Sequence, residues 1–291
     1  MKPIRAVAVL PTMFTLGNLI CGFFAIAVVS RIDKPVAMVG NPKEVAFVPA
    51  PRIESARELI TSDDPTHNLM LCGVLILAAM IFDAVDGQLA RITRGVSDFG
   101  AQLDSLCDLV SFGLAPAILL VKMCPQFTNI HNEAVWSIAA LFACCAALRL
   151  ARFNVEADAD DDHMSFAGLP TPAAAAVIAS FAILSYKLRN EVGYDYYDGY
   201  DWWMQRLLPL FAVVIALLMV SRIRYPHPLT QFLRGHRSFA HVVGILFAIM
   251  AVSFFAGYAV PLLCLLFVGG PPIRFAWEVL WHRRRQEEPL F

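Results

Sequence analysis

Long apolar segments recur along this chain, and they constrain its fold more than any other feature. We identify eight, each long enough to cross the roughly 30 Å hydrocarbon core of a bilayer as a helix. Only 16% of the residues are charged, whereas soluble domains contain about a quarter. We therefore expect an all-α polytopic membrane protein, with a single integral membrane domain over residues 1–291. The segments cover residues 6–30, 69–92, 99–122, 134–153, 168–187, 206–222, 238–257 and 259–275.

The distribution of basic residues predicts how these segments are oriented. An even number of segments places both termini on one side of the membrane. If that side is the cytoplasm, fourteen Lys and Arg residues lie at the cytoplasmic face and nine at the opposite face. Because positive residues favour the cytoplasmic side, we expect both termini there, with residues 223–291 forming additional C-terminal helices. The formal net charge of -1 gives no indication of nucleic acid binding.

Four aspartates interrupt the second and third apolar segments. Asp83 and Asp86 are three residues apart, and Asp104 and Asp108 are four apart, so each pair shares one face of a helix. A short connector containing Gly95 predicts that the two helices are antiparallel neighbours whose acidic faces converge. An ionised Asp near the bilayer centre costs about 2.5–3.5 kcal/mol even on lenient scales. These carboxylates therefore need partners.

Divalent cations are the partners that the pattern favours. Ligation by oxygen alone suits Mg²⁺, Mn²⁺ or Ca²⁺, and four carboxylates can hold two ions, as in enzymes that catalyse displacement at phosphorus. Gly87 would leave space for a ligand, and Arg91 would contact a diphosphate. Two alternatives are salt-bridged acids at a helix end and a cation-coupled transporter. Four acids on one adjacent helix pair favour the enzyme over the transporter.

The spacing of these residues resembles the signature of the CDP-alcohol phosphatidyltransferases. The matching pattern is Asp83-x2-Asp86-Gly87-x2-Ala90-Arg91-x8-Gly100-x3-Asp104-x3-Asp108. Members of this family transfer a phosphatidyl group from a CDP-linked lipid to an alcohol and release CMP. The resemblance implies the fold of that family, with the motif at the cytoplasmic ends of the second and third helices, and by analogy a homodimer.

The resemblance also implies a role for each matching residue. One of the aspartates, Asp108, would be the general base as well as a metal ligand. The metal ligands would be Asp83, Asp86, Asp104 and Asp108, and the contacts to CDP-diacylglycerol would be Gly87, Arg91 and Ser97.

Further stretches are similar to the phosphatidylserine synthase branch of the family. They are "LPTMFTLGNLICGFFAI" at 10–26, "LDSLCDLVSFGLAPA" at 103–117, "LRLARFNV" at 148–155 and "FAGLPTPAAAA" at 166–176. This similarity implies L-serine as the acceptor alcohol. We expect an enzyme of the cell's inner membrane whose active site faces the cytoplasm, because the basic residues place 91–98 at that face. The same chemistry with glycerol 3-phosphate, an inositol phosphate or choline stays open.

Four polar residues outside the signature are further candidates for substrate binding. Asn18, in the first segment, would contact the nucleotide end of the lipid or form a hydrogen bond between helices. The fourth segment reaches the cytoplasm near Arg149, Arg152 and Asn154. These residues would bind the carboxylate of serine or the lipid phosphate, and the alternative for the two arginines is anchoring at the positive inner face.

Overall fold

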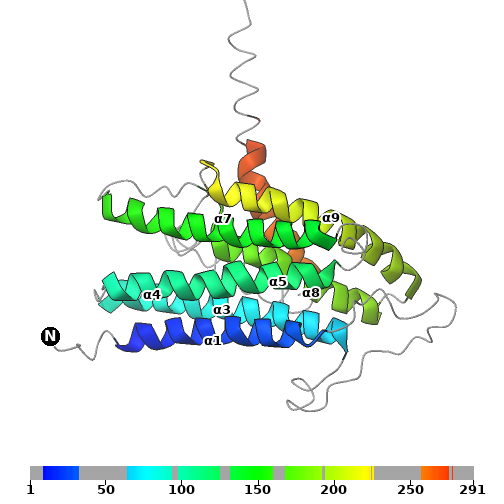
Figure 1. Ribbon diagram of the computed structural model, residues 1–291, viewed down its shortest axis with the longest axis horizontal. Coiled ribbons are helices and arrows are strands. Elements are labelled where there is room, and N and C mark those ends of the chain that lie inside the picture. Colours follow the sequence, from blue (N-terminus) through cyan, green and yellow to red (C-terminus); the bar gives the residue numbers. More distant parts are fainter. Residues whose placement is uncertain are drawn as a thin grey trace, which may run out of the picture.

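Long helices running side by side build the protein (Figure 1). The computed structural model describes residues 9–32, 64–93, 98–124, 132–159, 168–191, 194–223, 225, 257–274 and 277, and these ranges contain no β-strand. In chain order the helices are α1 (Val9–Ser30), α3 (Pro65–Thr93), α4 (Asp98–Asp108), η3 (Leu109–Leu114), α5 (Ala115–Met123), α7 (Asn132–Ala159), α8 (Thr171–Glu191) and α9 (Tyr194–Val220). A further helix covers residues 257–274.

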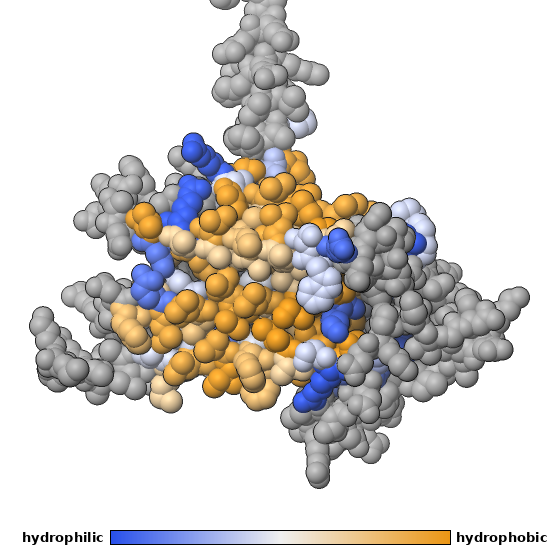
Figure 2. Space-filling model, viewed as in Figure 1, coloured by the Kyte–Doolittle hydropathy of each residue, from blue (hydrophilic) through white to orange (hydrophobic). Residues whose placement is uncertain are grey.

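Seven stretches in the described ranges are long and apolar enough to cross a membrane, and they confirm the predicted polytopic α-helical membrane protein. They are Thr12–Ser30, Pro65–Leu89, Phe99–Met123, Glu133–Val155, Thr171–Arg189, Trp202–Val220 and Gly257–Arg274. The predicted segment 238–257 lies outside the described residues except for Gly257. Figure 2 shows the matching surface, in which apolar side chains cover the middle of the helices and hydrophilic ones gather toward the two ends.

The third span is not one regular α-helix. The sequence predicts a continuous segment over 99–122, but α4 continues into the π-helix η3 before α5 begins. Pro116, in the first turn of α5, explains the irregularity. It has no backbone N–H, and its ring excludes the carbonyl group four residues earlier, so the regular ladder of hydrogen bonds cannot pass this point.

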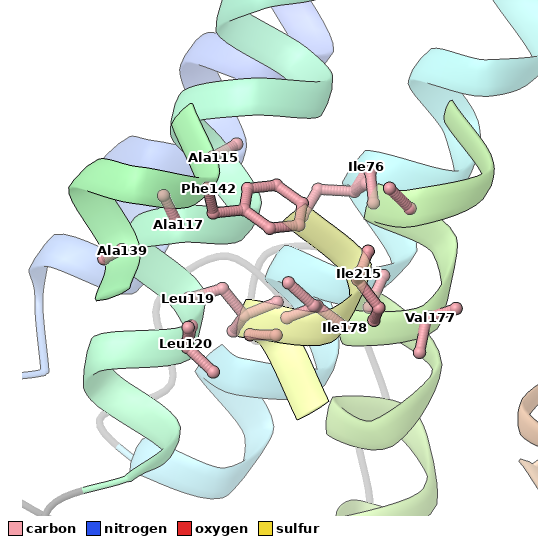
Figure 3. Close-up of a cluster of buried hydrophobic side chains, with 14 of the residues drawn as sticks. Ile76, Ala115, Ala117, Leu119, Leu120, Ala139, Phe142, Val177, Ile178 and Ile215 are labelled. Atoms are coloured by element: carbon pink, nitrogen blue, oxygen red, sulfur yellow. The ribbon is translucent and has the colours of Figure 1, made fainter. Parts of the chain in front are cut away.

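The core lies where α3, α5, α7, α8 and α9 meet, and Figure 3 shows Ile76, Leu119, Phe142, Ile178 and Ile215 pointing toward one another there. All five side chains are fully buried. Small residues bring the helices together around this core, as is typical of packing within membranes.

Two glycines allow close contacts between helices. A Cβ atom at Gly73 of α3 would lie 2.7 Å from the carbonyl oxygen of Ala179 in α8. A Cβ atom at Gly22 of α1 would lie 2.8 Å from Cα of Ser111 in η3. Any side chain at Gly22 would push α1 away from η3, and both elements contribute to the site described next.

Candidate active site

Three of the four predicted metal ligands come together at one end of the helices. Asp83 of α3 and Asp104 and Asp108 of α4 each offer a carboxylate oxygen, and these three oxygens lie within 4.8 Å of one another. The helical spacing explains the geometry, because Asp104 and Asp108 are one turn apart on α4 and face the end of α3. Asp108 is 8% exposed, and the other two carboxylates are half-buried.

Asp86 lies beside this group without belonging to it. It is one helical turn beyond Asp83 on α3 and only 4% exposed. Its carboxylate accepts a hydrogen bond from the side chain of Thr15 and interacts electrostatically with Asp104. The four aspartates are therefore neighbours, but only three of them offer oxygens at mutual distances that suit a single ion.

The donor set fits a divalent cation. Oδ2 of Asp86 and Oδ1 of Asp104 are buried and accept no hydrogen bond. Within the described part of the chain, no ion pair connects a basic side chain to any of the four acids. Buried carboxylate oxygens without donors are costly, and a hard metal ion is the partner that oxygen ligands favour.

Polar side chains of helix α1 form hydrogen bonds with aspartates of both α3 and α4. The amide nitrogen Nδ2 of Asn18 donates a hydrogen bond of 2.9 Å to Oδ1 of Asp108. Three residues earlier, Thr15 reaches Asp86. Asn18 is fully buried, and its backbone carbonyl in turn accepts a 3.0 Å bond from the hydroxyl of Ser111 in η3. The hydrogen bond between helices that the sequence leaves open for Asn18 is therefore present, whereas its contact with the lipid stays a prediction.

Arg149 of α7 is a basic residue whose charge acts on the acids. It interacts electrostatically with both Asp108 and Asp83. One guanidinium nitrogen donates a 3.3 Å hydrogen bond to the hydroxyl of Thr171, at the start of α8. Its Nε is buried and has no partner.

Asn154 has a protein partner in the structure. Its Nδ2 donates a 2.9 Å hydrogen bond to the hydroxyl of Ser105, and the hydroxyl donates a 3.2 Å bond back to Oδ1. Ser105 directly follows Asp104, so this pair ties α7 to α4 one residue from a predicted metal ligand. The sequence pattern predicts no role for Ser105, Thr171 or Thr15. The sequence feature that could have identified these three residues is a single hydroxyl side chain next to a motif residue or inside an apolar segment.

The remaining candidates differ in how far the structure describes them. A Cβ atom at Gly87 would have no neighbour within 4 Å, so there is open space beside Asp86. Arg152 is half-buried on α7. Ser97 and the side chain of Arg91 lie outside the described part of the chain.

Comparisons with known proteins add independent information. The family model for CDP-alcohol phosphatidyltransferase matches residues 8–220. A CDP-diacylglycerol–serine O-phosphatidyltransferase of Methanocaldococcus jannaschii is 36% identical over 226 residues, which cover 73% of this chain and 93% of the relative. The enzyme of the same name from Helicobacter pylori (strain 26695) is 36% identical over 164 residues, and the match spans 63% of its length and 56% of this chain. An archaetidylserine synthase of Methanothermobacter thermautotrophicus is 34% identical over 155 residues, which cover 53% of this chain and 57% of the relative.

Proposed function

The chain belongs to the CDP-alcohol phosphatidyltransferase family, and we propose that it transfers the phosphatidyl group of CDP-diacylglycerol to L-serine. The products would be phosphatidylserine and CMP. The observation that carries the proposal is the group of three carboxylate oxygens within 4.8 Å of one another, contributed by the two helices of the family signature. Relatives at 34–36% identity that carry the names of serine and archaetidylserine enzymes support serine as the acceptor.

The four aspartates would hold two divalent ions, Mg²⁺ or Mn²⁺, with Ca²⁺ as a possible substitute. When bound, such ions neutralise the diphosphate and stabilise the departing phosphate of CMP. The buried oxygens of Asp86 and Asp104 that lack hydrogen bonds support this role. Asn18 and Thr15 keep the carboxylates of Asp108 and Asp86 in place, because each side chain bonds one of them.

Asp108 would be the general base. It accepts the proton of the serine hydroxyl as the hydroxyl oxygen attacks the phosphorus that carries the diacylglycerol. The new P–O bond joins serine to the phosphatidyl group. The P–O bond to CMP breaks, and CMP leaves with the bonding electron pair. The hydrogen bond from Asn18 fixes which oxygen of Asp108 stays free for the proton.

The lipid would bind along α3 and the start of α4, with its nucleotide near Gly87, Arg91, Ser97 and Asn18. Its acyl chains would stay in the bilayer, which requires a site at the membrane edge. Asp83 and Asp86 lie toward the end of α3, and Asp104 and Asp108 lie in the first half of the span Phe99–Met123. The basic residues predict that this edge is cytoplasmic. We place the enzyme in the cell's inner membrane, and by family analogy as a homodimer.

Replacing Gly87 by Ala is expected to raise the KM for CDP-diacylglycerol about tenfold while the Tm stays equal or rises. The open space at this position would be reduced where the lipid approaches, and crowding of this kind costs about 1–3 kcal/mol. Alanine itself stabilises a helix by about 1 kcal/mol over glycine. Thermal unfolding and lipid titration measure the two effects. The matched control is Gly270→Ala, where a Cβ atom also meets nothing within 4 Å, and an equal rise in KM there would contradict the assignment.

The acceptor is tested by incubating the purified protein with CDP-diacylglycerol and one alcohol at a time. The proposal predicts that L-serine stimulates CMP release and that mass spectrometry identifies phosphatidylserine. It fails if CMP release ignores serine and follows glycerol 3-phosphate, an inositol phosphate or choline instead.

A further inference from the structure

The segment that precedes α8 is docked on the end of α9. The backbone N–H of Gly168 donates a 2.9 Å hydrogen bond to the carbonyl of Ile223, and that of Leu169 a 3.0 Å bond to the carbonyl of Leu218. Gly168 has a φ of 93°, and a Cβ atom there would collide with the carbonyl oxygen of Met219. This docking fixes the first residue of α8, Thr171, which is fully buried.

Thr171 in turn holds the guanidinium of Arg149. The 3.3 Å hydrogen bond to its hydroxyl joins the start of α8 to α7. An arginine side chain has several rotatable bonds, and ordering it costs up to about 2 kcal/mol of conformational entropy. A hydroxyl that is already fixed by the backbone of α8 lowers this cost for Arg149, which interacts electrostatically with Asp108 and Asp83.

The guanidinium group of Arg149 is suited to bind an anion. Its Nε is buried without a partner, and within the described ranges it forms no ion pair. A buried charge is stable only when it is paired, and the guanidinium fork matches a carboxylate through two parallel hydrogen bonds. Thr171 bonds one terminal nitrogen through a neutral oxygen, and Asp108 and Asp83 interact with the guanidinium electrostatically without an ion pair, so it can still pair directly with an anion.

The position of Arg149 identifies which anion it would bind. It is near enough to Asp108 to interact with that carboxylate electrostatically, and the hydroxyl of the acceptor must reach Asp108 to lose its proton. In serine the carboxylate is separated from the hydroxyl oxygen by only two carbon atoms. A serine whose hydroxyl faces Asp108 therefore brings its carboxylate to the neighbouring cation.

We propose that Thr171 is a positioning residue that orients Arg149 to bind the carboxylate of the acceptor alcohol, and that this contact selects serine over alcohols without a carboxylate. The inference rests on the proposed function of the site. It adds an assigned partner for Arg149 and a role for a threonine outside the family signature.

The test compares Thr171→Val, which keeps the shape but removes the hydroxyl, with Thr171→Ser, which keeps the hydroxyl. We expect Thr171→Val to raise the KM for L-serine about tenfold and to leave the KM for CDP-diacylglycerol within about twofold, since a lost hydrogen bond to a charged group has this effect. Thr171→Ser should have a KM for L-serine close to that of the wild-type enzyme. The preference for serine over serinol, which lacks the carboxylate, should fall in Thr171→Val.

Arg149→Lys is the second variant, because it keeps the charge and removes the fork. It should raise the KM for serine in the same way, whether or not Thr171→Val yields folded protein. The inference is overturned if Arg149→Lys or Thr171→Val raises the KM for the lipid instead, which would assign the guanidinium to the diphosphate, or if both KM values stay unchanged. A wild-type enzyme that releases CMP without serine would instead refute the proposed function itself.

Discussion

Replacing Asp108 by Asn is expected to lower serine-dependent CMP release by about 10²–10⁴-fold, the usual contribution of a general acid or base. The amide cannot accept the hydroxyl proton, and it is a poorer ligand for a cation. It has nearly the same size as the carboxylate, and its carbonyl oxygen can still accept the hydrogen bond from Asn18. The loss should therefore come from chemistry and not from unfolding.

The rate of CMP release and the elution profile of the purified variant in detergent measure these two effects. Glu133→Gln is the matched control, because it also neutralises an acid on a membrane-spanning helix, but at an exposed position at the start of α7. It should retain full activity. Normal turnover by the Asp108→Asn enzyme would remove Asp108 as the base.

Replacing Asp104 by Asn is expected to abolish tight divalent binding and, with it, turnover. Partners that only support a metal ligand already change metal affinity by 10–100-fold, so we expect loss of the ligand itself to cost at least about 100-fold. The effect should be large because Oδ1 of Asp104 is buried without a hydrogen bond and an amide would direct N–H groups toward a cation.

Thermal stability gives a second measurement of metal binding, and it does not depend on turnover. Without metal, removing one of several neighbouring negative charges should raise the Tm relative to wild type. With Mn²⁺ present the order should reverse, because ligands that bind only the folded state stabilise it. Titration with Mn²⁺, followed by electron paramagnetic resonance, measures the affinity. An unchanged Mn²⁺ affinity in Asp104→Asn would contradict the metal assignment.

The acidic cluster is the part of the site that the sequence predicts best. Spacings of three and four residues on two segments joined by a short connector predict that the acidic faces converge, and in the structure oxygens of Asp83, Asp104 and Asp108 lie within 4.8 Å of one another. The spacing of residues within one helix does not indicate which residue of a distant helix contacts these aspartates. The contact of Asn18 with Asp108 spans 90 residues in sequence, so it depends on how α1 packs, and close packing at Gly22 decides that.

The boundaries of the helices are a second feature that the sequence predicts incompletely. The sequence predicts the sixth segment from 206, whereas α9 begins at Tyr194. Similarly α7 extends to Ala159, six residues past the predicted end. Hydropathy finds the part of a helix that lies in lipid, but a helix continues into water wherever its backbone bonds persist. The π-helix η3 was missed because Pro116 only forbids the regular ladder, and packing determines which alternative replaces it.

The account depends on divalent ions held between α3 and α4. Anomalous diffraction from crystals grown with Mn²⁺ and CDP-diacylglycerol tests this most directly. We expect two anomalous peaks among Asp83, Asp86, Asp104 and Asp108, with carboxylate oxygens at roughly 2.0–2.6 Å, the range for hard cations, and with the diphosphate in contact with both. Peaks found only elsewhere, or a bound lipid whose diphosphate lies away from these four side chains, would contradict it.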